Sequence, residues 1–85
     1  MSDLILPIIH PNGSSQEELV DLRKNASRAL LGALEALSAM APNGRDYYPQ
    51  PGLYERAVAQ HEARVAAVRS VYEAVSEETT EVSFL

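Results

Sequence analysis

The chain has 85 residues, no cysteine and a formal net charge of -5 at pH 7. This length allows one domain with a small core, and the lack of cysteine excludes a disulfide framework or a thiolate zinc site. The acidic balance disfavours a nucleic acid polymer as partner, although a few local cations can still hold a small anion.

The apolar residues near the start predict neither a membrane span nor a signal peptide. The longest apolar run, Leu4 to Ile9, is interrupted by Pro7, whereas crossing a bilayer takes about 20 apolar residues. The run also lacks the basic flank that a signal peptide has. We therefore expect a soluble, cytoplasmic protein.

Residues 1–13 are predicted to form an extended arm that ends in a turn. Pro7 and Pro11 disfavour a helix, and the apolar residues between Leu4 and Ile9 are strand-like. So many large apolar side chains are costly to leave in water. The arm should either pack along its own hairpin, which we favour, or cross onto a neighbouring subunit.

Residues 15–40 are predicted to form the first helix. Ser14 with Glu17, and equally Ser15 with Glu18, fits the Ser-x-x-Glu capping box. The free amides of this helix start, with Gly13 beside them, could also form an anion-binding site, although such serines more often serve only as structural caps. Two apolar stripes follow at helical spacing, so more than one partner helix is needed. One stripe is Leu19, Leu22, Ala26, Ala29, Ala33, Ala36 and Met40, and the other is Leu30, Leu34 and Leu37.

A loop over residues 41–52 is predicted to join this helix to a second one over residues 53–77. Pro42 stops the first helix, and Asn43 with Gly44 favours left-handed backbone. The tail, residues 78–85, is β-prone and is expected to dock on the hairpin or pair with the arm. The second helix carries one apolar seam with a histidine in it, formed by Tyr54, Val58, His61, Val65, Val68, Tyr72 and Val75.

These elements predict an all-α fold, an antiparallel two-helix hairpin with extended N- and C-terminal arms. A chain this small buries little surface on its own, so we expect it to assemble into a homo-oligomeric helical bundle. Turning the chain about the loop places Ala33 near His61 and Leu30 near Arg64, which would put two polar side chains of the second helix against small and apolar residues.

The loop carries larger and more functional side chains than a chain reversal requires. Turns are built from small and polar residues, whereas this loop also carries Arg45, Tyr47 and Tyr48. In one interpretation the tyrosines plug the end of the hairpin and Arg45 caps carbonyls of the first helix. In the other the loop is the wall of a binding site. The sequence leaves both open.

No catalytic motif is present, so we predict a protein that is not an enzyme and needs no cofactor. The chain has no His-Glu-x-x-His, no P-loop, no dinucleotide fingerprint and no cysteine nucleophile. His10 and His61 with Asp46 or Glu62 have no specific ligand spacing, and no metal site is predicted.

The candidate binding residues combine arginine, tyrosine and histidine, which suit a small anionic, nucleotide-type ligand. Arginine binds phosphate through a planar fork, and tyrosine offers a flat face for a base. The first helix begins far from the loop, so residues of the first turn could join the others only across a subunit boundary. The set is Arg45, Tyr47, Tyr48, His61 and Arg64, with Asn12, Ser14 and His10 as contributors from the first turn.

Three pieces of the chain resemble a group of small helical proteins of bacteriophages and prophages. They are His10-x-Asn12-Gly13-x-Ser15, Asn43-Gly44-Arg45-Asp46-Tyr47-Tyr48-Pro49-Gln50 and His61-Glu62-x-Arg64. The resemblance covers most of the chain, and Pro11 departs from it where an apolar residue is expected. By looser analogy the chain is similar to the phage sponges, small oligomers that hold nucleotide immune signals between subunits.

The resemblance implies a phage protein that acts against host defence in the cytoplasm of the infected bacterium by sequestering such a signal, a cyclic nucleotide or a cyclic ADP-ribose derivative. Two alternatives belong to other classes. One is a structural or protein-interaction hairpin that inhibits or scaffolds a host or phage protein through its acidic face and apolar arms. The other is a small hydrolase of the signal.

Overall fold

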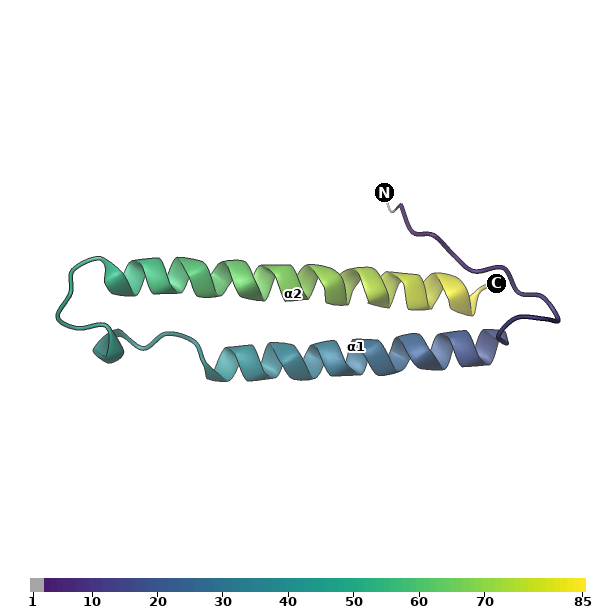
Figure 1. The fold of residues 1–85 in the computed structure, drawn as a ribbon, viewed down its shortest axis with the longest axis horizontal. Coiled ribbons are helices and arrows are strands. Elements are labelled where there is room, and N and C mark those ends of the chain that lie inside the picture. Colours follow the sequence, from purple (N-terminus) through teal and green to yellow (C-terminus); the bar gives the residue numbers. More distant parts are fainter. Residues whose placement is uncertain (1–2) are drawn as a thin grey trace.

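In this computed structural model, which describes residues 3–85, the chain forms two long antiparallel helices. α1 spans Gln16–Ala39, α2 spans Leu53–Ser83, and the short 3₁₀ helix η1, Gly44–Asp46, lies in their connection. Residues 3–85 contain no strand. Figure 1 shows the helices side by side, with the start of α1 and the end of α2 opposite the loop. The prediction of an all-α hairpin is confirmed.

α1 begins where a capping box fixes its first turn. The backbone N–H of Glu18 donates to Ser15 Oγ at 3.1 Å, and Glu18 Oε1 accepts from the Ser15 backbone N–H at 3.2 Å. These two bonds satisfy donors that a helix start otherwise leaves free. Of the two capping boxes that the sequence offers, the structure forms the one at Ser15, and Ser14 lies outside it.

The helices meet along one seam in which contact residues recur at steps of three and four, as in a two-stranded coiled coil. The predicted seam of α2 is confirmed from Val58 to Val75, and it continues to Val82, the one fully buried side chain among residues 3–85. The facing residues of α1 are half-buried and include two polar side chains; they are Val20, Arg23, Ser27, Leu30, Leu34 and Leu37.

The other predicted stripe of α1 is mostly left uncovered in the single chain. Leu22 is 62% exposed and Met40 is 56% exposed, and the alanines between them are also exposed. We call this face, with its counterpart on α2, the small-residue side of the hairpin. It consists of Leu22, Ala26, Ala29, Ala33, Ala36 and Met40 on α1 and Arg64, Ala67, Val71 and Ala74 on α2.

The prediction of a β-prone tail over residues 78–85 is wrong, because α2 continues past the expected end at Glu77 to Ser83. β-Branched threonine is a modest helix former, but here each hydroxyl finds a partner within the helix. Thr79 Oγ1 donates to the carbonyl of Val75 at 2.7 Å, and Thr80 Oγ1 donates to the carbonyl of Ser76 at 3.2 Å.

α1 also caps the last turn of α2, which further explains why that helix extends so far. Gln16 Nε2 lies 3.0 Å from the carbonyl oxygens of Val82, Ser83 and Leu85. The final carbonyls of a helix have no partner within it. A side chain from the start of one helix therefore completes the end of the other, and burial of Val82 holds that turn in place.

The backbone of the connection differs from the prediction. Asn43 is extended, with φ -112° and ψ 128°, and its side chain accepts a bond from the Arg45 backbone N–H at 3.1 Å. Left-handed backbone occurs instead at Gly52, where φ is 80°, at the start of α2. The expectation at Asn43 and Gly44 was wrong because the asparagine side chain stabilises the start of η1 rather than a turn of its own backbone.

α2 extends beyond α1 at the loop end, and the connection continues from α1 alongside this extra length before it reverses into α2 (Figure 1). This shifts the register of the hairpin from the predicted one. His61 lies beside Ser38 and Ala41, around a hollow that they line together, rather than beside Ala33. The predicted register assumed that α1 ends level with the start of α2, which is not the case.

The N-terminal arm packs along its own hairpin, as favoured from the sequence. Leu4 and Leu6 are half-buried and line a shallow hollow with Glu77 and Glu81 of α2. Alternate residues point outward, so that Ile5 is 90% exposed. Neither helix of the described residues is apolar enough over a sufficient length to cross a membrane.

Candidate functional site

A hollow of about 440 Å³ lies on one side of the seam, towards the loop end. Its lining is apolar at the seam and charged at the rim: Leu34, Ser38, Ala41, His61, Glu62, Val65, Ala66 and Arg69. We call this hollow the His61 groove. His61 Nδ1 is buried there and has no hydrogen-bond partner within the described protein.

The helical spacing of α2 builds this groove. His61 and Val65 belong to the seam, whereas Glu62, Ala66 and Arg69 follow one another at steps of four and three along the adjacent edge. The small side chains opposite, Ser38 and Ala41, leave space in front of the imidazole. Ser38 lies on the exposed edge beside the seam residue Leu37, and Ala41 follows the end of α1, so the groove opens where small side chains flank the seam.

The groove can serve three kinds of ligand group. Its apolar surface suits a flat ring, Arg69 can pair with an anion, and Glu62 can accept hydrogen bonds from an amine. His61 adds one position that can donate or accept, according to its tautomer. None of these groups is arranged as a nucleophile with an adjacent base.

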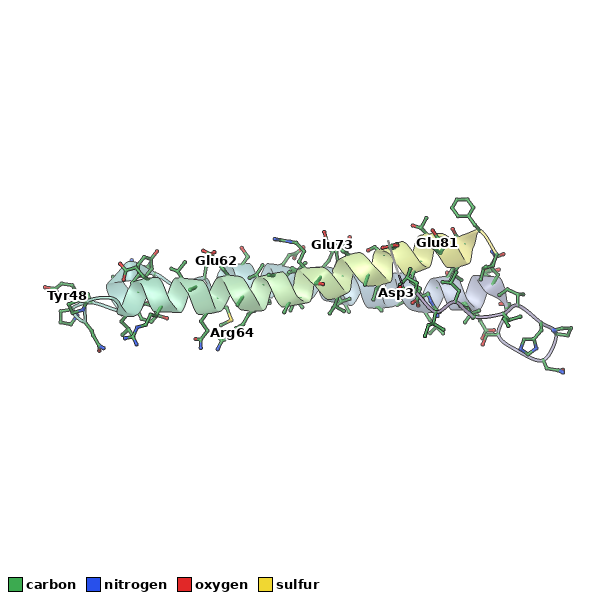
Figure 2. All side chains as sticks on the ribbon, turned by 90° about the horizontal axis from the view of Figure 1, so that it is seen from above. Asp3, Tyr48, Glu62, Arg64, Glu73 and Glu81 are labelled. Carbon is green, nitrogen blue, oxygen red and sulfur yellow. The ribbon has the colours of Figure 1, made fainter. Side chains whose placement is uncertain are left out.

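Arg64 is not part of the groove, contrary to the prediction that it and His61 face one pocket. Figure 2 shows Arg64 and Glu62 on opposite sides of α2. Two residues apart on a helix, side chains diverge, so Glu62 reaches the groove and Arg64 lies on the small-residue side. The groove's cation is Arg69, which sequence reasoning missed although it shares an edge with Glu62 at helical spacing.

The two loop tyrosines have different surroundings. The Tyr47 ring packs near that of Tyr54, with centroids 6.3 Å apart and planes at 46°. Tyr48 is 84% exposed at the tip of the hairpin (Figure 2). The plug interpretation therefore fits Tyr47 and not Tyr48. Both rings border a shallow loop hollow of about 230 Å³ with Pro49, Gln50, Pro51 and Tyr54.

Arg45 does not cap the end of α1. Its backbone N–H is bonded to Asn43, but its guanidinium makes no hydrogen bond or ion pair within residues 3–85. The last carbonyls of α1 at Leu37 and Ser38 instead accept bonds from backbone N–H groups of Met40 and Ala41. A binding role for Arg45 stays a prediction.

The residues predicted from the first turn, His10, Asn12 and Ser14, lie at the opposite end of the hairpin from the loop (Figure 1). α1 alone separates the two ends by about 36 Å. His10 also occupies the space that Gly13 leaves, since a Cβ there would lie 2.8 Å from His10 Nε2. A single chain therefore does not bring these three residues to Arg45.

Charge is divided between the two ends of the molecule. Residues 29–72 hold four acids, Glu35, Asp46, Glu55 and Glu62, and four arginines, Arg45, Arg56, Arg64 and Arg69. The remaining eight acids and three basic residues lie in residues 1–28 and 73–85. The whole net charge of -5 thus falls near the chain ends, and an anion at the loop end meets a locally neutral surface.

The described residues contain no group of three side chains placed to hold a metal ion. Comparison of the chain with protein-family models, with curated proteins and with solved structures finds no match.

Proposed function

We propose that this protein binds a small anionic, nucleotide-type ligand without transforming it, and so sequesters it. The observation that carries the proposal is the buried, unpartnered Nδ1 of His61, a residue that lines the same hollow as Arg69. Buried polar atoms without a partner are rare in folded proteins, because each costs about 1–3 kcal/mol. A ligand that bonds this nitrogen removes that cost.

The dimensions and chemistry of the groove agree with such a ligand. Small-molecule sites are usually hollows of about 300–1,000 Å³ with an apolar lining and a few polar groups, and the groove measures about 440 Å³. Arg69 has no ion pair among residues 3–85, so its fork is available to a phosphate. Sequestration requires only binding, so no catalytic group is needed in the groove.

Self-association is part of the proposal, because one hairpin leaves too much surface in water. A compact monomer of this size exposes about 5,000 Å², whereas this chain exposes 6414 Å². The excess, on the order of 1,400 Å², exceeds the roughly 800 Å² that each partner contributes to a standard interface. The small-residue side is the apolar face that a second copy would cover.

An antiparallel second copy would also bring its first turn towards the loop. His10, Asn12 and Ser14 of that copy could then complete a site with Arg45, whose guanidinium makes no bond within the described residues, and with the exposed Tyr48. The resemblance to phage proteins supports the same setting, a sponge for a nucleotide immune signal in an infected cell.

The test is a depletion assay. Purified protein is incubated with cyclic mono-, di- and trinucleotides and cyclic ADP-ribose derivatives, the free fraction is removed by filtration, and the protein is heated to release what it holds. We expect one compound to be lost from the filtrate and recovered intact. Recovery of a product would instead indicate a hydrolase, and a full set of free compounds would refute nucleotide binding.

Two arginine variants locate the ligand. Arg69→Gln removes one charge from the groove and is expected to weaken binding at least tenfold, since a charge-assisted bond contributes about 1.5–3 kcal/mol. Arg64→Gln removes the same charge one turn away on the other side of α2 and serves as the matched control. Loss of binding in Arg45→Ala or Arg64→Gln, with Arg69→Gln unchanged, would place the ligand between copies instead of in the groove.

The alternative function, a hairpin that docks on a protein, is favoured by one observation. The terminal end exposes Ile5 and Ile8 on the arm and Phe84 after α2, the last 81% exposed. Under this alternative, Ile5→Ser with Phe84→Ser abolishes the biological effect while Arg69→Gln leaves it intact. The sequestration proposal expects the reverse.

A further inference from the structure

A second hollow, of about 330 Å³, lies between α1 and α2 in the half of the hairpin nearer the chain ends. It is separate from the His61 groove and shares no lining residue with it. Most of its lining surface is apolar, but the lining residues include two cations and three hydroxyl side chains; they are Lys24, Ser27, Arg28, Leu31, Ser76 and Thr79. No carboxylate lines it.

Ser27 lies in the seam of α1 and lines this hollow. Its Oγ is buried and has no hydrogen-bond partner within the described protein. Other hydroxyls near the chain end satisfy themselves by donating to their own helix, as Thr79 does to Val75 and Ser83 to Thr80. Ser27 is in an equivalent position to do so on α1 and does not, so its donor is available to a bound group.

The two cations at the rim are largely free. Lys24 makes no ion pair among residues 3–85, and Arg28 uses one N–H for the side chain of Asn25 at 3.1 Å. Four donors of that guanidinium therefore remain. Asp21 is one helical turn before Lys24 but makes no salt bridge with it. In a region that is otherwise acidic, this is a local concentration of positive charge and donors.

We propose that this hollow is a second binding site, for an oxyanion such as a phosphate group, held by Lys24 and Arg28 and by the hydroxyl of Ser27. The arginine fork and the ammonium group neutralise the charge, and Ser27 donates from below. Ser76, whose hydroxyl has no bond to another described residue, can add a donor from α2. This site does not depend on the His61 groove having a ligand.

The test uses the full chain and inorganic phosphate, with backbone amide NMR shifts as the measurement. Phosphate is titrated against acetate and chloride at constant ionic strength, so that general screening is equal in each arm. We expect saturable shifts around Lys24 to Leu31 and at Ser76 and Thr79. Saturable shifts with phosphate support an oxyanion site, whether or not acetate produces the same shifts. Equal shifts with chloride would mean that the protein responds to ionic screening alone and would refute the site.

Variants test which residues bind the phosphate. Lys24→Gln with Arg28→Gln should weaken phosphate binding at least tenfold, and Ser27→Ala should weaken it severalfold while leaving the remaining amide spectrum unchanged. Arg64→Gln, which removes a charge from the small-residue side, should have no effect. If Arg64→Gln weakens phosphate binding as much as Arg28→Gln, the site does not exist and the protein responds only to its net charge.

Discussion

The two ends of the hairpin differ in how their polar groups are used. At the terminal end, Gln16 caps the last turn of α2, Arg23 Nε pairs with Glu78 Oε2 at 2.7 Å, and Val82 is fully buried. At the loop end, His61 Nδ1 and the guanidinium of Arg69 have no partner within the described protein. Bonds across the seam thus hold one end together and leave the other with groups free for a ligand.

The largest difference in stability between the two ends should come from the same substitution, valine to alanine, made once at each end. Val82→Ala removes a fully buried side chain and is expected to cost about 2 kcal/mol, since both apolar burial and a filled space are lost. Val58→Ala, in the half-buried part of the seam beside the loop, should cost about half as much. Urea unfolding at one protein concentration measures both, and equal losses would contradict a firmer terminal end.

Gln16→Ala should destabilise the protein by about 1 kcal/mol, because several carbonyls at the end of α2 lose their donor. Hydrogen exchange should show the loss locally, as faster exchange in the last turn of α2 with little change at Val58. A useful control is Gln60→Ala, because Gln60 is an exposed glutamine of α2 whose side chain makes no hydrogen bond within the described residues. Uniform acceleration in both variants would mean that Gln16 acts on global stability alone.

Sequence patterns were sufficient to predict the hairpin, since capping, helical spacing and Pro42 are local signals. The extension of α2 through Thr79 and Thr80 was not predictable from propensity, because it depends on hydroxyl bonds within the helix and on Gln16, which is 66 positions away from Val82. Tertiary contacts override weak β preference in such cases.

The candidate site was predicted only in part, for a geometric reason. His61 was recognised as a polar residue in an apolar seam, and it does line a groove. Arg64 does not share this groove, because helical spacing turns it to the small-residue side. The predicted register was a separate error, since the connection runs along α2 and moves the partners of His61 to Ser38 and Ala41. A helical wheel places Arg69, and not Arg64, beside Glu62.

The ion pair between Arg23 and Glu78 should contribute less than Gln16. Both side chains are about a quarter exposed, at 22% and 27%, so solvent screens the pair and a coupling of about 0.5–1 kcal/mol is expected. A double-mutant cycle with Arg23→Ala and Glu78→Ala measures it, and raised salt should reduce it. Arg28→Ala with Glu73→Ala is a control cycle across the same helices without a recorded bond, and a coupling of equal size there would show a general charge effect.

The smallest effect on stability should be that of Tyr48→Ala at the tip of the loop, for which Tyr47→Ala is the matched comparison. Tyr47→Ala removes the ring that packs on Tyr54 and should cost about 1 kcal/mol, whereas Tyr48→Ala removes an exposed ring and should stay within about 0.5 kcal/mol. The proposed function adds a second expectation, that Tyr48→Ala weakens binding of the ligand recovered in the depletion assay if a second copy completes the site. Unchanged stability with lost binding would assign Tyr48 to recognition, because a ring that is 84% exposed has little packing to lose. Unchanged stability with unchanged binding would leave the His61 groove to hold the ligand alone.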